Sequence, residues 1–427
     1  MSRPHRLLAG IILLHLALGL LYDWAMPIFE ASDEGAHYGM TRYLAQNRAL
    51  PVQQPALQKD GLHTAYEQEG SQPPLYYALA AALTGWIDTA DFSLAFVRNP
   101  LSRVGVPGTT HNANLYRHPP LRPPLAGTAL AVHLIRWFSL LLSAGTVALT
   151  YELARRAAAQ NFKLQTSNLK SQISNLKSAI ALGPPSSVLG LLAAALVAFN
   201  PMALFINASI NNDNLLMLLS TAALLVMLPL AGSSDAPSSR RTVALGALLG
   251  LAALTKVSGL VLWPVAGIAA AIGAGRALRA GEAPLVVLRR FALTGVLMAG
   301  TAVAVCGWWY LRNRQLYGEW LGLQTMVAIA GPRAPITLIE LFRGEWLSFW
   351  RSYWGVFGAF TVLAADWVYR FFDALTLAAL AGGLLSLGRR NRSVALDWAA
   401  AGLFALFCAL TFVGVVRWTL LTLASQG

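Results

Sequence analysis

The sequence predicts an all-α protein, a polytopic bundle of transmembrane helices that forms a single integral membrane domain over residues 1–427. Three observations lead to this prediction. Apolar residues make up 56% of the chain and charged residues only 12%, whereas soluble domains carry about 25% charged residues. The mean hydropathy is +0.53. The apolar residues gather in runs close to the roughly 20 residues that an α-helix needs to cross a bilayer.

Nine apolar runs are candidate membrane spans. They lie at 6–27, 128–153, 188–206, 214–231, 242–257, 259–275, 291–311, 367–387 and 395–416. Arginines and lysines, with almost no acids, gather in four of the connections between them: 154–187, 232–241, 276–290 and 388–394. Because basic loops stay on the cytoplasmic side, we expect a multi-pass protein of the plasma (bacterial inner) membrane with a cytoplasmic N-terminus.

This orientation places residues 28–127 outside the cell as a long first extracytoplasmic loop. Its apolar stretch 73–90 is expected to lie on or dip into the outer face, because counting it as a span would turn every basic loop outward. The segment 33–46 is expected to be a short amphipathic helix with Ser32 as its N-cap. The cytoplasmic loop 154–187 contains a near-duplicate SNLKS and is interpreted as a low-complexity insertion without chemistry.

Composition also argues against several partners and cofactors. The net charge is +13, but the basic residues are spread over short loops, so membrane topology explains them better than nucleic acid does. Cys306 and Cys408 both fall inside apolar runs, which indicates neither a disulfide framework nor a zinc cluster. The sequence contains no metal-binding motif and predicts no cofactor, and a divalent cation held by Asp33 or Glu34 is left open.

The segment after the first apolar run, PIFEASDEGAHYGMTRYLAQ, carries the strongest chemical signal. Asp33 and Glu34 form an acidic pair, and His37 shares a helix face with Asp33 because the two are four residues apart. Adjacent helical residues point about 100° apart, so the two acids are expected to have different roles. Charges at the membrane–water boundary are candidates for chemistry. Carboxylates in a first helical turn also suit the helix dipole, which leaves a capping role open.

Five segments follow one another in register with the predicted topology: DEGAHY, QPPLYY, NPM with NNDN, LGLAALTKVSGL and GWWYLRNRQLYG. In this order they resemble the GT-C fold family, polytopic glycosyltransferases that use lipid-phosphate sugars. This superfamily includes the dolichyl-phosphate-mannose-protein mannosyltransferases, the aminoarabinose transferases and bacterial members formerly of unknown function. The resemblance covers almost the whole chain.

The resemblance implies an extracytoplasmic active site that moves a sugar, with inversion, from a polyprenyl-phosphate donor to a hydroxyl of a glycan, lipid or protein acceptor in the cell envelope. Asp33 matches the general base of the family, and Glu34 is expected to bind the acceptor or to orient the site. A hydroxyl is a poor nucleophile until a base takes its proton, whereas a phosphate leaving group needs cations. One carboxylate base and several cations are therefore expected.

Other segments supply the remaining site candidates. The candidate substrate-binding residues are His37, Gln72, Asn212 and Asp213, and the candidate donor-phosphate ligands are Arg136, Lys256 and Arg312. Guanidinium forks match phosphate oxygens, and Lys256 divides two apolar runs, where an ionisable residue is a functional hypothesis by default. Plainer alternatives stay open: His37 packs at the membrane surface, Asp213 caps the next span, and the cations snorkel to the interface.

Two features depart from the family. Gln72 stands where relatives commonly have a lysine before the paired prolines, which leaves a phosphate contact at this position open. The chain stops at RWTLLTLASQG, where relatives usually continue, so a C-terminally truncated member is expected. Residues 91–127, rich in Pro, Asn and Arg, are the expected acceptor surface.

Two functions besides sugar transfer stay open: a transporter or flippase of lipid-linked glycans, and a non-catalytic membrane assembly protein. A transporter would place ionisable residues near the bilayer midplane on broken helices. Convergence of Asp33, Lys256 and Arg312 would favour the enzyme. Two further segments show patterns typical of helix packing and of the membrane interface. The aromatic-rich segment 344–360 suits an interfacial belt or sugar stacking, and GALLG at 246–250 allows close helix approach.

Overall fold

The computed structural model describes most of the chain, and most of what it describes is helix. The described residues are 2–55, 64–102, 105, 114–118, 124–162, 185–388 and 398–422. Most of the predicted low-complexity insertion (154–187) and a large part of the predicted acceptor surface (91–127) lie outside them.

The bundle helices are α1 (Arg3–Ala25), α6 (Gly127–Phe162), α8 (Pro185–Ala198), α10 (Asp213–Gly232), α11 (Ser239–Thr255), α12 (Leu262–Arg279), α13 (Pro284–Tyr317), α16 (Asp366–Gly388) and α17 (Trp398–Leu421). The shorter helices are α2 (Glu34–Asn47), η1 (Glu67–Ser71), α4 (Leu75–Thr84), α5 (Phe92–Ala95), α9 (Pro201–Asn207), η2 (Val257–Val261), α14 (Leu323–Ala330) and α15 (Leu338–Gly355). The strands β1 (Val356–Phe357) and β2 (Val362–Leu363) pair antiparallel.

The predicted all-α, multi-pass character is confirmed, but the count of nine spans is not. Within the described residues, seven helices are long and apolar enough to cross a membrane, or up to eight if the bent pair α8 and α9 is one span. That pair bends by 65° because Pro201 starts a new helix, with the Asn200 side chain accepting a hydrogen bond from the Ala203 N–H. α11 has 17 residues, which extend about 25 Å, less than the roughly 30 Å of a hydrocarbon core.

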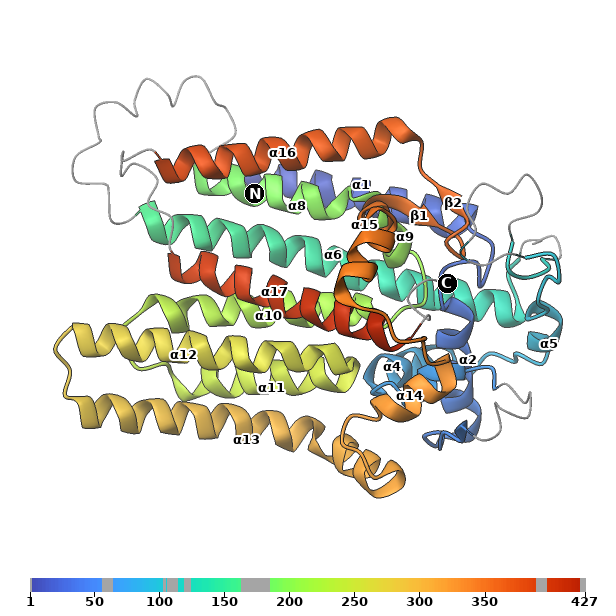
Figure 1. Cartoon of the computed structure of the whole chain (residues 1–427), viewed down its shortest axis with the longest axis horizontal. Helices are drawn as coiled ribbons and strands as arrows, with labels where there is room; N and C mark the ends of the chain where they lie inside the picture. Colours follow the sequence, from blue (N-terminus) through green and yellow to red (C-terminus); the bar gives the residue numbers. More distant parts are fainter. Residues whose placement is uncertain are drawn as a thin grey trace.

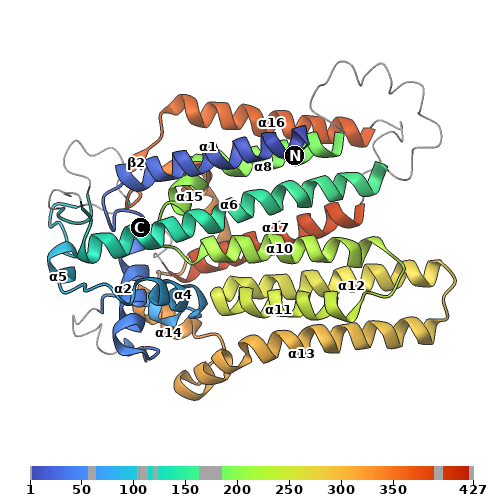
Figure 2. The ribbon, with the colours of Figure 1, turned by 180° about the vertical axis from the view of Figure 1, so that it is seen from behind.

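The long helices lie side by side, and the short ones gather at one end of the bundle (Figure 1). We call this end, which carries α2, α4, α5 and α14, the α2 end. The connections 233–238 and 280–283 lie at the opposite end, as the reverse view also shows (Figure 2). The two sides expected from the sequence are therefore opposite ends of the bundle. Which end faces the cytoplasm stays a prediction.

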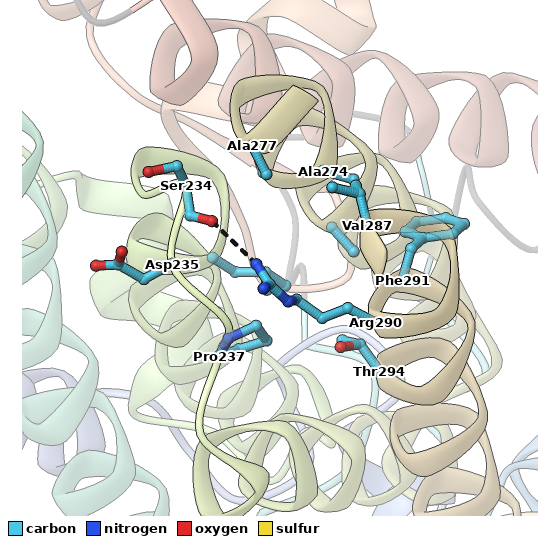
Figure 3. Close-up of a pocket in the computed structure, with 12 residues that line it drawn as sticks. Ser234, Asp235, Pro237, Ala274, Ala277, Val287, Arg290, Phe291 and Thr294 are labelled. Atoms are coloured by element: carbon cyan, nitrogen blue, oxygen red, sulfur yellow. Dashed lines mark hydrogen bonds between the residues drawn. The ribbon is translucent and has the colours of Figure 1, made fainter. Parts of the chain in front are cut away.

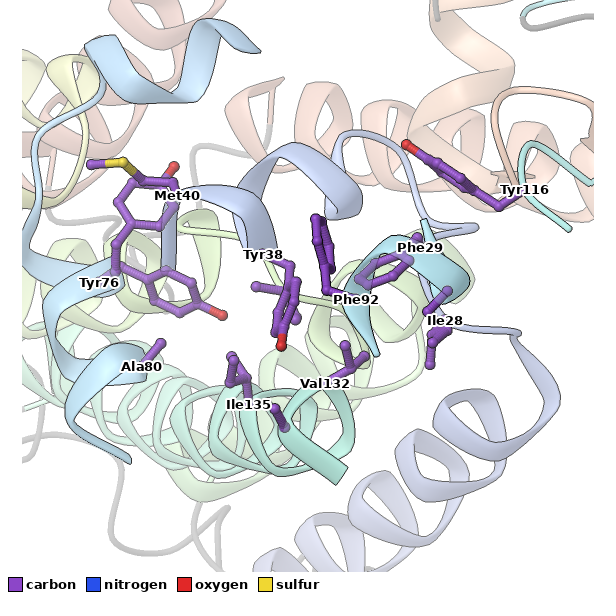
Figure 4. Close-up of a cluster of buried hydrophobic side chains, with 14 of the residues drawn as sticks. Ile28, Phe29, Tyr38, Met40, Tyr76, Ala80, Phe92, Tyr116, Val132 and Ile135 are labelled. Atoms are coloured by element: carbon purple, nitrogen blue, oxygen red, sulfur yellow. The ribbon is translucent and has the colours of Figure 1, made fainter. Parts of the chain in front are cut away.

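An aromatic core anchors the short helices on the bundle (Figure 4). Phe29, which is fully buried, contacts Tyr38 of α2 at 5.3 Å between ring centroids and Tyr116 at 5.8 Å. Tyr76 of α4 donates or accepts a hydrogen bond with Ser139 of α6 at 2.8 Å. The same core includes apolar residues of α6, so α2 and α4 are held against the membrane bundle rather than extending from it.

Helix α15 contains most of the aromatic-rich segment. Its start is fixed by a capping box between Thr337 and Glu340. Trp346 stacks on Trp350 with 6.4 Å between ring centroids, while Trp346 and Tyr353 remain 45% and 58% exposed. An exposed aromatic face of this kind suits the interfacial belt.

Two glycines of GALLG let α11 approach α13 closely, as the sequence pattern predicts. A Cβ atom on Gly246 would lie 2.4 Å from the Met298 carbonyl oxygen, and one on Gly250 would lie 2.7 Å from that of Ala302. Backbone atoms cannot yield as a flexible side chain does. The two helices are therefore in contact through their main chains.

We expect Gly246→Ala to destabilise the protein by about 1–3 kcal/mol, the usual cost of an added methyl group in a packed interior. Gly300→Ala is the matched control, because Gly300 lies in α13 and has nothing within 4 Å of a Cβ position. Alanine favours helix over glycine, so this control should be neutral or slightly stabilising. Thermal unfolding in detergent measures both. Equal effects of the two substitutions would contradict the close helix contact.

Candidate functional site

Asp33 lies at the start of α2, in a conformation that frees its carboxylate from the helix end. Its φ angle is +58°, in the left-handed region, which Asp tolerates better than most residues. Asp33, rather than Ser32, occupies the N-cap position, and its side chain makes no capping hydrogen bond. The predicted Ser32 cap is therefore wrong. The capping alternative for Asp33 has no support in the geometry either, because its side chain accepts no hydrogen bond from the first helical N–H groups.

The Asp33 side chain lines a pocket at the α2 end with about 710 Å³ of empty space, including the part open to solvent. Its polar lining residues are Ser32, Asp33, Glu67, Gln68, Arg98 and Tyr116. The Gln68 side-chain amide makes a long contact of 3.5 Å to Asp33 Oδ1. Arg98 pairs with Glu67 at 2.8 Å and supplies a cation to this pocket. Sequence analysis did not single out Arg98.

Burial, and then the nearby Glu69 carboxylate, raise the pKa of Asp33 to about 7, while His37 and Lys256 act in the opposite direction. A carboxyl group with this pKa is about half ionised at neutral pH. It is a stronger base than an ordinary aspartate and is still available in its charged form. These are the properties that a general base needs.

Glu34 points away from this pocket and is completely buried. Its carboxylate accepts two hydrogen bonds from Arg136, at 2.8 Å from Nε and 2.6 Å from Nη2. It also accepts the backbone N–H groups of Phe29 at 2.8 Å and Ile210 at 3.0 Å. Both oxygens are thus used twice. Two roles were expected for Glu34. The geometry fits a role in orienting the site. It does not fit acceptor binding, because neither carboxylate oxygen is free to accept a hydrogen bond from an acceptor.

Arg136 does not have the geometry of the predicted phosphate ligand. It is 0% exposed, and besides Glu34 it contacts Asp23 Oδ1 at 3.3 Å and the carbonyl oxygens of Asp23, Met26 and Pro27 at 2.9–3.0 Å. All of its nitrogens donate to these partners, so none is left for a phosphate. The snorkelling alternative also fails, because the side chain is enclosed between α1, α2 and α6.

We expect Glu34→Gln to lower the stability of the folded protein by about 3–5 kcal/mol, because it leaves a buried arginine short of countercharge. The double variant Glu34→Gln with Arg136→Met removes both charges and should recover part of that loss. Thermal unfolding of the detergent-solubilised protein measures the effect. A single variant as stable as the parent protein would contradict the structural role of this pair.

Lys256 and Asp213 form an ion pair at 2.8 Å near the buried acids. Lys256 follows the last residue of α11 as its C-cap, and Asp213 begins α10. Asn212 occupies the N-cap position of α10, so the predicted capping role of Asp213 is wrong. Asn212 itself is buried and donates to the Thr255 carbonyl at 3.3 Å. The Lys256 charge lowers the pKa of both Asp33 and Glu69, which places it within electrostatic reach of the pocket.

His37 contacts two groups that the sequence analysis did not single out. Its Nδ1 lies 2.8 Å from the Tyr77 hydroxyl and 3.4 Å from Glu69 Oε2. Burial lowers the pKa of His37 to about 4, so the ring is neutral at physiological pH. It does not pack at a membrane surface, because only 3% of it is exposed. Both partners lie in the segment QEGSQPPLYY (68–77), which includes the QPPLYY motif, but their burial depends on how η1 and α4 pack.

Gln72 and Arg312 are placed differently from Asp33. Gln72 follows η1 as its C-cap and is buried, and its Oε1 has no hydrogen-bond partner within the described part of the chain. Arg312 donates to the Pro51 carbonyl at 2.7 Å and lies 5.2 Å from the centre of the Trp309 ring. His37 and Lys256 thus lie close enough to Asp33 for their charges to act on its pKa. Arg312 instead forms its hydrogen bond with the segment after α2.

Two further hollows lie at the opposite end of the bundle, among α10, α11, α12 and α13. Asp235 borders both, and Arg290 of α13 reaches across one of them to the Ser234 carbonyl at 3.4 Å (Figure 3). None of the site residues predicted from the sequence lines them. The α2 end is therefore the candidate site.

The described residues contain no group of three or more His, Cys, Asp or Glu side chains that could hold a metal ion. A divalent cation thus gains no support from these residues. Comparison with known proteins adds no identity: no family model, no curated protein and no solved structure matches this chain.

The raised pKa of Asp33 predicts a pH-dependent effect on stability. A carboxyl group whose pKa is higher in the folded than in the unfolded state costs stability as the pH rises through the interval between the two values. Asparagine tolerates the left-handed conformation and has no charge. Asp33→Asn should therefore raise the thermal midpoint at pH 8 and have little effect near pH 4. An equal change at both pH values would show that the Asp33 carboxyl is not perturbed.

Proposed function

We propose that this chain is a membrane glycosyltransferase. In this proposal it moves a sugar from a polyprenyl-phosphate donor to a hydroxyl of a glycan, lipid or protein acceptor at the α2 end, which would face outward. The observation that carries the proposal is Asp33, a carboxyl group with a pKa of about 7 in a solvent-open pocket at the end of an apolar helix bundle. It is also the residue that matches the base of the GT-C family in the sequence.

The groups near Asp33 suit the two halves of a sugar transfer. The carboxylate takes the proton of the acceptor hydroxyl as the hydroxyl oxygen forms a bond to the sugar carbon. The bond between that carbon and the phosphate oxygen breaks, and the polyprenyl phosphate leaves with the electron pair. Arg98 in the pocket and Lys256 nearby are the cations available to stabilise the charge on this leaving group.

The two other functions have less support. The bent pair α8 and α9 is a broken helix of the kind that transporters use, but α9 lies toward the α2 end rather than in the middle of the bundle (Figure 1). A non-catalytic assembly protein has no need for carboxyl groups whose pKa values lie near neutrality. Perturbed values of this kind favour a functional site.

Transfer is tested with the full chain in lipid nanodiscs and a panel of radiolabelled polyprenyl-phosphate sugars. We expect Asp33→Asn to lower turnover by a factor of about 10²–10⁴, the usual contribution of a general base. Asp88→Asn is the control, because Asp88 is an exposed acid of the same end that does not line the pocket. Unchanged turnover in Asp33→Asn would overturn the base assignment. Failure of the unsubstituted chain with every donor would contradict the proposed function.

A further inference from the structure

We propose that Glu69, Tyr77 and His37 form a hydrogen-bonded relay beside Asp33. In this proposal Glu69 is a second carboxyl group of the site and a positioning residue that sets the charge next to the base. The inference deepens the proposed function and rests on it for the reaction. The relay itself can be tested without a substrate.

The relay joins three helical elements: α2, η1 and α4. Tyr77 of α4 donates its hydroxyl to Glu69 Oε2 of η1 at 2.8 Å. His37 Nδ1 of α2 lies 2.8 Å from the same hydroxyl and stacks on the tyrosine ring at 5.8 Å with an angle of 22°. All three side chains are at least nine-tenths buried. Their geometry is therefore fixed by packing rather than by solvent.

The Tyr77 hydroxyl has one proton for two partners. The hydrogen bonds of the relay can therefore run in either of two directions. When Glu69 is ionised, Tyr77 donates to it and His37 must donate its Nδ1–H to the tyrosine oxygen. When Glu69 is protonated, it donates to the tyrosine oxygen and Tyr77 donates to a His37 Nδ1 that carries no hydrogen. Both arrangements pair the three atoms that meet at the Tyr77 hydroxyl, so a proton can reside on Glu69 or leave it without breaking these two hydrogen bonds.

Asp33 is close enough to sense this proton. His37 follows Asp33 by one helical turn on α2, and its backbone N–H donates to the Asp33 carbonyl at 2.9 Å. Gln68, next to Glu69 in η1, reaches the Asp33 carboxylate. Two buried carboxyl groups in one site resist simultaneous ionisation. Burial above all raises the pKa of Glu69 to about 7, as it does for Asp33.

Other charged groups around the relay also act on the pKa values of Asp33 and Glu69. The titratable groups that face it are Glu34 of α2, Glu67 of η1, Tyr76 of α4, Asp213 of α10 and Lys256 just after α11. Glu67 raises the pKa of Asp33 less than Glu69 does. The Lys256 ammonium favours ionisation of both acids, but its direct contact is with Asp213. We therefore expect Asp33 and Glu69 to share about one proton near neutral pH and to titrate as a pair.

Infrared titration of the protonated-carboxyl band measures this coupling in the full chain in nanodiscs. Asp33→Asn identifies the component that belongs to Asp33. Glu69→Gln keeps the size of the side chain and removes its charge, so the Asp33 midpoint should fall by about one pH unit or more. Glu67→Gln on the same helix is the matched control and should shift it less. An unmoved Asp33 midpoint in Glu69→Gln, or an equal shift in the control, would overturn the relay.

Tyr77→Phe supplies a second test that keeps the ring stacked on His37. The lost hydroxyl stabilises the ionised form of Glu69, so the Glu69 midpoint should rise. A Glu69 midpoint that stays at the parent value would contradict the relay. Size-exclusion profiles and thermal midpoints establish that each variant is folded before its titration is read.

The sugar-transfer assay separates this inference from the proposed function. If transfer occurs, the acidic limb of its pH–rate profile should move to lower pH in Glu69→Gln, because Asp33 then ionises more easily. Transfer that depends on Asp33, together with an Asp33 midpoint that Glu69 does not affect, would support the function and overturn the relay. If Asp33 and Glu69 titrate as a pair but no sugar is transferred, the relay is supported and the proposed function is contradicted.

Discussion

The buried ion pair between Glu34 and Arg136 is the interaction on which the α2 end depends. Both side chains are 0% exposed, and together they connect four parts of the chain: α1 through Asp23, the turn before α2 through carbonyl oxygens, α6 through Arg136, and the connection before α10 through Ile210. Buried charges are costly unless their partners are fixed and complete. This pair therefore specifies one arrangement of these segments.

That arrangement separates two adjacent acids. Because Glu34 points inward to Arg136 and Asp33 precedes the first turn in a left-handed conformation, the carboxylate of Asp33 is directed to the pocket. A non-glycine residue at positive φ persists only where the surroundings determine it, and such residues cluster at functional sites. The pair DE in the sequence is thus one anchored carboxylate and one chemically available carboxylate.

The sequence alone predicts the helical, membrane-spanning character of the fold, because an apolar run of about 20 residues is typical of a transmembrane helix. It was not sufficient for helix breaks, because Pro201 starts a new helix inside the run 188–206, which looked continuous. For the site, the spacing of Asp33 and His37 indicated a shared helix face. Arg136 was misassigned because sequence shows a cation but not its partners. Glu69 and Tyr77 were missed because their burial arises only when η1 and α4 pack on α2.

The position of Lys256 explains how the site keeps its carboxyl groups basic. An ammonium bonded directly to Asp33 would lower the pKa of that carboxyl, and a carboxylate with a low pKa is a weak base. In this structure the direct contact of Lys256 is taken by Asp213, at 2.8 Å, so Asp33 and Glu69 experience its charge only at longer range. Asp213 thus contributes indirectly. By holding the cation, it leaves burial as the largest influence on both acids, followed by the Glu69 charge for Asp33 and by the more distant Lys256 charge for Glu69. Burial favours the protonated form of each acid, which keeps both carboxyl groups basic.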